Sequence, residues 1–201
     1  GLPLRSADRK EGPFVICGGP CAFNPEPLAP FVDLVALGDG EEETQQTIDL
    51  YKRWKAAGLP REAYLRMAAQ IPGIYVPSLY DVVYNDDGTV RSVKPKPGSG
   101  APEVVRKAFL KYLDKATYPD KLIVPYGEIV HNRIMLEIFR GCTRGCRFCQ
   151  AGMIYRPVRE RSIDHLMKMA ESLVSSTGYD EISLMSLSSG DYSCLAELAH
   201  R

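Results

Sequence analysis

Three cysteines within eight residues constrain this chain more than any other feature of its sequence. Cys142, Cys146 and Cys149 are spaced C-x3-C-x2-C on a loop that contains Gly145. The loop directly follows residues 133–139, an apolar run that predicts a buried strand. Three thiolates at this spacing can bind three irons of a cubane cluster and leave the fourth iron without a protein ligand. The sequence therefore predicts a metal-binding loop at the end of a strand.

A structural zinc site is the alternative for clustered cysteines. Closed zinc sites use four ligands and usually show paired C-x2-C spacings, and no second pair is present near the loop. The other candidate ligands are far away in the sequence: Cys17, Cys21, Cys194, His131, His165 and His200. Their irregular spacing also argues against a disulfide scaffold.

The cysteine loop, with Phe148 before its last cysteine, resembles the signature of the radical S-adenosylmethionine (SAM) superfamily. In that superfamily the open iron of a 4Fe-4S cluster chelates SAM. The wider run 139–162 resembles a mostly uncharacterised group with an N-terminal cobalamin-binding-like domain. The resemblance implies an enzyme that reductively cleaves SAM to a 5′-deoxyadenosyl radical. It also implies an electron donor such as a flavodoxin or ferredoxin, and it leaves the final substrate open, RNA or a small molecule included.

The composition is that of an ordinary globular protein. Twenty-five basic and twenty-five acidic residues cancel, so the global charge attracts neither nucleic acid nor a membrane. There is no apolar run of membrane-spanning length and no signal-peptide pattern. We therefore expect a cytoplasmic protein with no membrane partner, where thiolates stay reduced.

The N-terminal part, residues 1–59, reads as α/β. Two apolar runs, 13–17 and 34–37, each end in a glycine turn, and a helix is expected at 41–58. This pattern predicts a partial Rossmann-like sheet, and it resembles the closing half of a cobalamin-binding domain. The resemblance makes four glycines candidates for cobalamin contact: Gly18, Gly19, Gly38 and Gly40. They could equally serve as tight strand–helix turns, and the cobalt-ligand pattern Asp-x-His-x-x-Gly is absent from the chain.

Residues 60–130 read as a connector with a hairpin and a helix. Residues 80–84 and 89–93 alternate about an Asp- and Gly-rich turn, which predicts the hairpin. Pro102 can open a helix that carries an apolar stripe as far as Leu113.

Residues 131–201 predict the first strand–helix units of a radical SAM partial TIM barrel. The strand at 133–139 is followed by a helix from Ser162 to Gly178 and a second strand at 181–187. Because a barrel needs several more units, we expect this domain to be truncated and the chain to be a fragment. By resemblance, the cofactor-binding residues for SAM are Phe148, Ser188, Ser189, Gly190 and Asp191.

Six arginines lie between residues 140 and 161 against one acid, Glu160. Such a run can steady an anionic cluster, bind the carboxylate of SAM or bind phosphates. It can also be a solvated face or a docking surface for an acidic electron donor. Two non-catalytic alternatives thus stay open: an iron–sulfur electron-transfer module and a metal-stapled RNA-binding domain.

Overall fold

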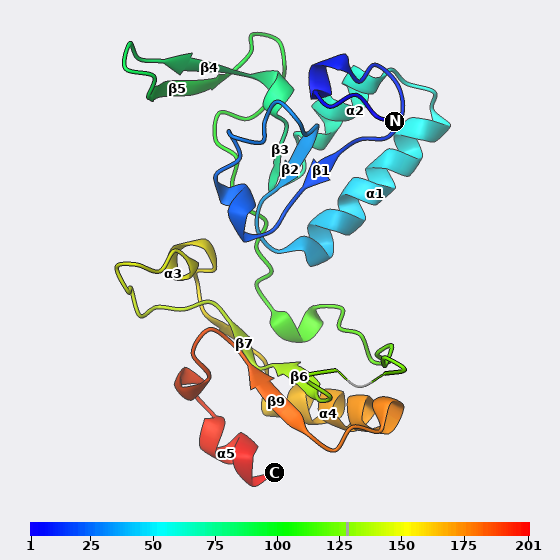
Figure 1. Ribbon diagram of the computed structural model, residues 1–201, viewed down its shortest axis with the longest axis vertical. Coiled ribbons are helices and arrows are strands. Elements are labelled where there is room, and N and C mark those ends of the chain that lie inside the picture. The colour runs from blue at the N-terminus through cyan, green and yellow to red at the C-terminus, as the bar shows by residue number, and fades with distance from the viewer. Residues whose placement is uncertain (128) are drawn as a thin grey trace. The chain divides into compact units, whose positions relative to one another are not determined.

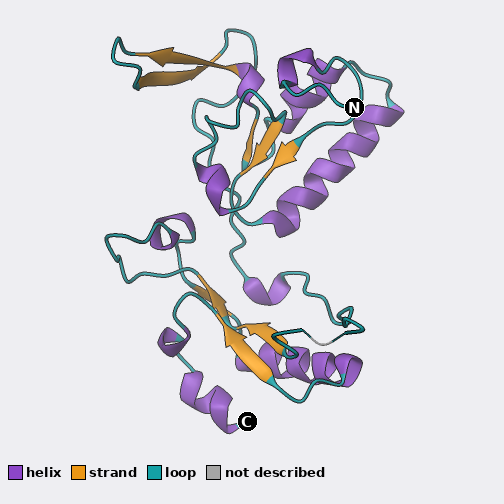
Figure 2. Ribbon diagram, in the orientation of Figure 1, coloured by secondary structure: helices purple, strands orange, loops and turns teal. Residues whose placement is uncertain are grey.

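A computed structural model of the protein describes residues 1–127 and 129–201 (Figure 1). The chain forms two units, Gly1–Phe109 and Leu110–Arg201, each with its own strands, helices and hydrophobic core (Figure 2). The boundary between them lies within residues 60–130, the segment predicted as a connector. In the part of the chain that the structure describes, no helix is both long enough and apolar enough to cross a membrane.

A three-stranded sheet, ordered β1-β2-β3, forms the centre of the N-terminal unit. β1 (Ile16–Cys17) pairs in parallel with β2 (Leu34–Ala36), which confirms the predicted parallel pair. β3 (Ile74–Tyr75) pairs with β2 in the antiparallel direction. A 3-10 helix, Pro20–Phe23, follows the first glycine turn. The four prolines between residues 20 and 30 disfavour an α-helix in this segment, because they lack the amide hydrogen that an α-helix requires.

Two helices pack with this sheet: α1 (Gly40–Ala56) and α2 (Arg61–Ala68). α1 starts at the second glycine turn, as the sequence predicts, with three glutamates in its first turn, near the positive end of the helix dipole. The core between helices and sheet includes Leu34, Tyr64 and Ile74, each at most 1% exposed. Burying a large apolar side chain contributes about 1.5–3 kcal/mol, so each of these three residues stabilises the unit measurably.

The predicted hairpin is confirmed. β4 (Tyr80–Tyr84) and β5 (Val90–Pro95) pair in the antiparallel direction about the turn at 85–88. Asn85 N donates to Thr89 O at 2.8 Å and closes that turn. The hairpin projects from the sheet of its own unit, as Figure 1 shows.

The helix predicted to start at Pro102 does not form. Ala108 instead forms a parallel bridge with Gly38. Its amide donates to Leu37 O at 2.7 Å, and its carbonyl accepts from Asp39 N at 3.0 Å. These bonds satisfy backbone groups that a helix would otherwise pair. The prediction from the apolar stripe was therefore wrong, because strand-like pairing with the end of β2 prevails over helical periodicity.

A parallel strand pair forms the centre of the C-terminal unit. β6 (Ile134–Glu137) pairs with β9 (Ile182–Met185), and α4 (Ile163–Thr177) connects them, as the sequence predicts. Ser162 Oγ accepts from His165 N at the start of α4, and Gly178, with φ +73°, ends the helix. The apolar face of α4 packs on β6 within the core of this unit.

The other strands and α-helices of the C-terminal unit are short. They are β7 (Phe139–Arg140), α3 (Ala151–Ile154), β8 (Arg159–Glu160) and α5 (Leu195–His200), with β7 and β8 paired in the antiparallel direction. The described residues thus form a mixed α/β protein with small sheets and without a closed barrel.

Candidate functional site

The cysteine loop begins just after β6 and β7. Ile138 N donates to Met185 O at 3.1 Å, so the chain stays paired with β9 up to the last residue of that strand. The loop at 142–149 therefore follows the carboxyl end of one parallel strand, beside the carboxyl end of the other. Ligands of α/β proteins commonly bind at this edge of a parallel sheet.

Gly141 turns the chain into the loop. Its φ is +101°, and a Cβ atom built on it would lie 2.6 Å from Pro157 O and 2.7 Å from Tyr155 O. These are backbone atoms, which cannot move aside as a flexible side chain can. Gly145, within the loop, has φ +67°, but its Cβ would meet nothing closer than Arg156 Nη2 at 4.0 Å. Both positions require positive φ, but only at Gly141 would a side chain also clash with neighbouring backbone atoms.

The three thiols of this loop differ in exposure. Cys146 is exposed, and Cys142 and Cys149 are partly buried. Cys149 N donates to Cys146 O at 3.0 Å, while Arg144 N donates to Cys142 Sγ at 3.5 Å. Among the described residues, no three Cys, His, Asp or Glu side chains gather as a metal-binding group, so the structure does not bring the three predicted ligands together. The donor set nevertheless suits an iron–sulfur cluster, since it offers three thiols and an amide that donates to sulfur.

The second strand leads into a serine-rich turn. β9 is followed by a 3-10 helix, Ser189–Asp191, in which Asp191 N donates to Ser188 O at 2.8 Å. Ser189 Oγ lies 2.9 Å from Ser186 Oγ and is directed back toward the strand end. Ser188 Oγ donates to Asp191 Oδ2 at 2.8 Å. The turn therefore orients one carboxylate through a neighbouring hydroxyl.

Arg144 of the cysteine loop binds this carboxylate. Its Nε donates to Asp191 Oδ2 at 2.7 Å, and its Nη2 donates to Asp191 Oδ1. Hydrogen bonds from Arg144 and then Ser188 lower the pKa of Asp191, and the same pairing raises the pKa of Arg144. The paired geometry is the bidentate form that arginine and carboxylate prefer. Both groups are therefore charged at neutral pH.

A cavity of about 600 Å³ lies beside this ion pair. Its lining combines the cysteine loop with the turn after β9, and it is made by Phe139, Cys142, Thr143, Arg144, Val158, Ser188 and Asp191. Of the five residues predicted to contact SAM, Ser188 and Asp191 thus share a cavity with the first cysteine. Phe148 is 93% exposed, and neither it nor Ser189 or Gly190 lines the cavity.

Most of the arginine-rich run has a structural role. Glu137 Oε2 accepts from Arg140 Nη2 and from Arg161 Nη2, each at 3.1 Å, and Arg161 is 2% exposed. Arg159 is also buried and donates to backbone carbonyls. Arg147 is exposed and has no hydrogen-bond or ion-pair partner among residues 1–127 and 129–201. Glu137 is a charged residue within the apolar run 133–139, and this exception is the sequence signal for the network.

The glycines proposed for cobalamin contact have different surroundings. A Cβ on Gly38, whose φ is +109°, would lie 2.1 Å from Ala108 O, so close backbone approach accounts for this glycine. Gly40 is the first residue of α1. A Cβ on Gly18 would lie 3.7 Å from Ala36 Cβ, and one on Gly19 would meet nothing within 4 Å. The space beside Gly18 and Gly19 is therefore open to a ligand, whereas the space beside Gly38 is filled by the protein's own backbone.

A family model matches part of the N-terminal unit. Residues 1–77 match the family model described as radical SAM proteins, N-terminal, and the cysteine loop lies outside that match. An uncharacterized protein of Methanocaldococcus jannaschii is 37% identical in an alignment of length 109 that covers 48% of this chain and 24% of the relative. The matched segment thus spans about a quarter of that relative. Residues 1–77 are thus similar to the N-terminal region of radical SAM proteins.

Proposed function

We propose that this chain is part of a radical SAM enzyme that binds a 4Fe-4S cluster through Cys142, Cys146 and Cys149. In the same proposal, residues 1–59 are a cobalamin-binding-like, Rossmann-type half domain, and residues 131–201 are the start of a partial TIM barrel. When bound and reduced, the cluster supplies an electron that cleaves SAM to methionine and a 5′-deoxyadenosyl radical. The proposal does not specify the substrate on which that radical acts.

One observation gives this proposal its main support. Cys142, at the start of the cysteine loop, lines the same cavity as Ser188 and Asp191, from the turn after the parallel neighbour strand. A volume of about 600 Å³ lies in the range of small-molecule sites. The N-terminal family match supports the same superfamily independently, because it involves none of these residues.

The ion pair in the cavity suits the amino-acid end of SAM. Asp191 offers a carboxylate for the ammonium group, and Arg144 offers a guanidinium for the carboxylate, so the two charges match a zwitterion. We expect SAM to insert between these two groups and to exchange their mutual hydrogen bonds for bonds to the ligand. Ser188 keeps the Asp191 carboxylate oriented during this exchange.

The test uses the full-length protein, reconstituted anaerobically with iron and sulfide and then given SAM and a low-potential reductant. We expect formation of 5′-deoxyadenosine, measured by mass spectrometry. Asp191→Asn should raise the SAM concentration needed for half-maximal cleavage about tenfold or more, because it removes the charge that attracts the ammonium. Glu197→Gln, on α5, removes an exposed carboxylate outside this cavity and is the matched control.

Three results would contradict the proposal. If the protein holds a complete cluster, forms no 5′-deoxyadenosine and shows no spectral change on addition of SAM, it is an electron-transfer module. Zinc instead of iron and sulfide in the anaerobically purified protein would indicate a metal-stapled domain. Equal SAM dependence of Asp191→Asn and the wild type would show that the carboxylate does not bind the cofactor.

A further inference from the structure

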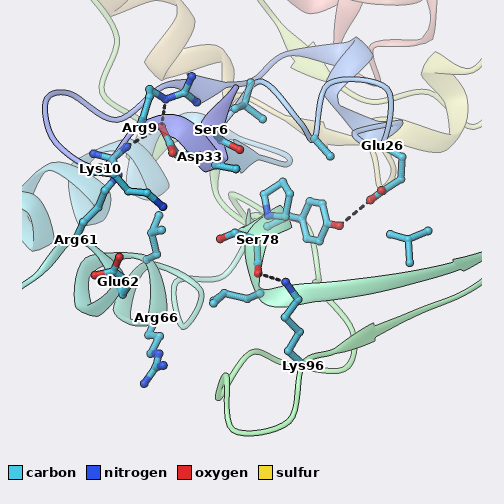
Figure 3. Close-up of a pocket in the computed structure, with 18 residues that line it drawn as sticks. Ser6, Arg9, Lys10, Glu26, Asp33, Arg61, Glu62, Arg66, Ser78 and Lys96 are labelled. Atoms are coloured by element: carbon cyan, nitrogen blue, oxygen red, sulfur yellow. Dashed lines mark hydrogen bonds and ion pairs between the residues drawn. The ribbon is translucent and has the colours of Figure 1, made fainter. Parts of the chain in front are cut away.

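The N-terminal unit contains a second cavity that the proposed chemistry does not use. Its volume is about 460 Å³, and it lies between the N-terminal turn, α2 and the β4–β5 hairpin, as Figure 3 shows. A cavity of this size can hold a small organic molecule. Ten of its lining residues carry polar side chains: Ser6, Arg9, Lys10, Glu26, Asp33, Arg61, Glu62, Arg66, Ser78 and Lys96.

A buried ion network builds one wall of the cavity. Asp33 Oδ2 lies 3.2 Å from Arg9 Nε and 3.0 Å from Arg61 Nη2, and the three side chains are at most 9% exposed. Arg9 also donates to three backbone carbonyls of the N-terminal segment and of the chain before β2. Because buried charges are costly unless they are paired and hydrogen-bonded, this wall is a fixed part of the fold. Its guanidinium groups are already engaged.

Two cations of the rim have no such partner. Lys10 and Arg66 are exposed, and neither forms an ion pair within the described residues 1–127 and 129–201. Lys96 donates to Ser78 O at 2.9 Å and lies 4.0 Å from Asp81. In all, five cationic and three acidic side chains line the cavity, so its potential favours an anion.

Part of the cavity lining, called the floor here, is apolar. Val32 and Tyr75 are 7% and 6% exposed, and Leu65, Leu79 and Val82 complete this surface. The Tyr75 hydroxyl donates to Glu26 Oε1 at 2.6 Å, so the Glu26 carboxylate already has a hydrogen-bond partner. The cavity thus combines an apolar floor with a rim that has uncompensated positive charge.

We propose that this cavity binds a small organic anion, with an apolar body on the floor and a phosphate or carboxylate group attracted by the cationic rim that includes Lys10 and Arg66. The floor excludes inorganic anions as preferred ligands, since they would leave the apolar surface uncovered. The charged rim disfavours neutral apolar ligands. The site lies wholly in the N-terminal unit and involves no cysteine of the metal loop.

The experiment titrates the chain with four probes and follows amide chemical shifts by NMR. The probes are phenyl phosphate, phenylacetate, inorganic phosphate and benzyl alcohol. We expect either or both of the organic anions to shift amides in α2 and at residues 78–82, and to bind at least tenfold more tightly than inorganic phosphate and benzyl alcohol. The stronger of the two organic anions identifies the acidic group.

The test variant is the double substitution Lys10→Gln and Arg66→Gln, which should weaken binding at least tenfold at low salt. The control is Arg91→Gln and Lys94→Gln, which removes the same charge from exposed hairpin residues outside the cavity. Trp54 fluorescence reports whether each variant keeps the folded unit. Equal binding by the folded double variant and the wild type, absence of shifts at these segments, or equal affinity for inorganic phosphate would each overturn the proposal. The measurement needs no metal, so its outcome is independent of SAM cleavage.

Discussion

Gly141 is the residue at which the geometry of the cysteine loop can be tested most sharply. A methyl group there would lie 2.6 Å from Pro157 O and 2.7 Å from Tyr155 O, and the φ of +101° is unfavourable for alanine. Positive φ costs about 1–3 kcal/mol for a non-glycine residue. Forcing a methyl group into packed atoms costs about another 1–3 kcal/mol. We therefore expect Gly141→Ala to lower the free energy of unfolding of the C-terminal unit by about 2–6 kcal/mol.

Gly145→Ala is the matched control. It places the same substitution in the same loop at positive φ, but its methyl group would meet nothing closer than Arg156 Nη2 at 4.0 Å. Only the backbone strain remains, so about 1–2 kcal/mol is expected. The difference between the two variants isolates the close approach of residues 155–157 to Gly141.

Hydrogen exchange measured by mass spectrometry on α4 is the suitable assay, because that helix belongs to the same core as β6. A further loss of about 2 kcal/mol in Gly141→Ala corresponds to an exchange rate about 30-fold faster than in Gly145→Ala. Trp54 lies in the N-terminal unit, and its fluorescence should show an unchanged urea transition. Equal exchange in the two variants would refute the reasoning.

Two further predictions concern the N-terminal unit. Glu43 is 5% exposed, and burial raises the pKa of its carboxyl group. The stabilising contribution of the protonated group is therefore lost as the pH rises through that raised value. Urea unfolding followed by Trp54 fluorescence should show that Glu43→Gln stabilises the unit relative to wild type at pH 7 more than at pH 4. Asp33→Ala should cost about 3–5 kcal/mol in the same assay, because it leaves Arg9 and Arg61 as buried charges without their carboxylate. A pH-independent difference for the first variant, or a cost under about 1 kcal/mol for the second, would contradict these assignments.

Local signals in the sequence predicted much of the fold. The Ser162 cap, the 3.6-residue periodicity and Gly178 define α4, and the turn at 85–88 defines the hairpin. The glycine turn after β2 likewise predicts the start of α1. Each of these signals involves residues within a few positions of one another, which is why the sequence alone is sufficient.

Contacts between distant residues could not be predicted in this way. The segment after Pro102 has a helical apolar pattern, yet Ala108 pairs with residues near 38, about 70 positions earlier. Asp33 joins Arg9, 24 positions away, and no local pattern signals that pair. At the candidate site, the spacing of the cysteines and the serine turn could be identified, but the ion pair between Arg144 and Asp191 spans 47 positions. Local sequence signals do not specify such pairings.

The central claim is that Cys142, Cys146 and Cys149 bind an iron–sulfur cluster with one open iron. Iron and sulfide determination with electron paramagnetic resonance, on the full-length protein reconstituted anaerobically, tests it most directly. We predict about four irons and four sulfides per chain. Alanine at any of the three positions should abolish the intact cluster, while Cys194→Ala should keep it. A change of the reduced-cluster spectrum on adding SAM completes the prediction. A full complement of iron and sulfide in the Cys142→Ala variant, or bound zinc in place of iron, would contradict the claim.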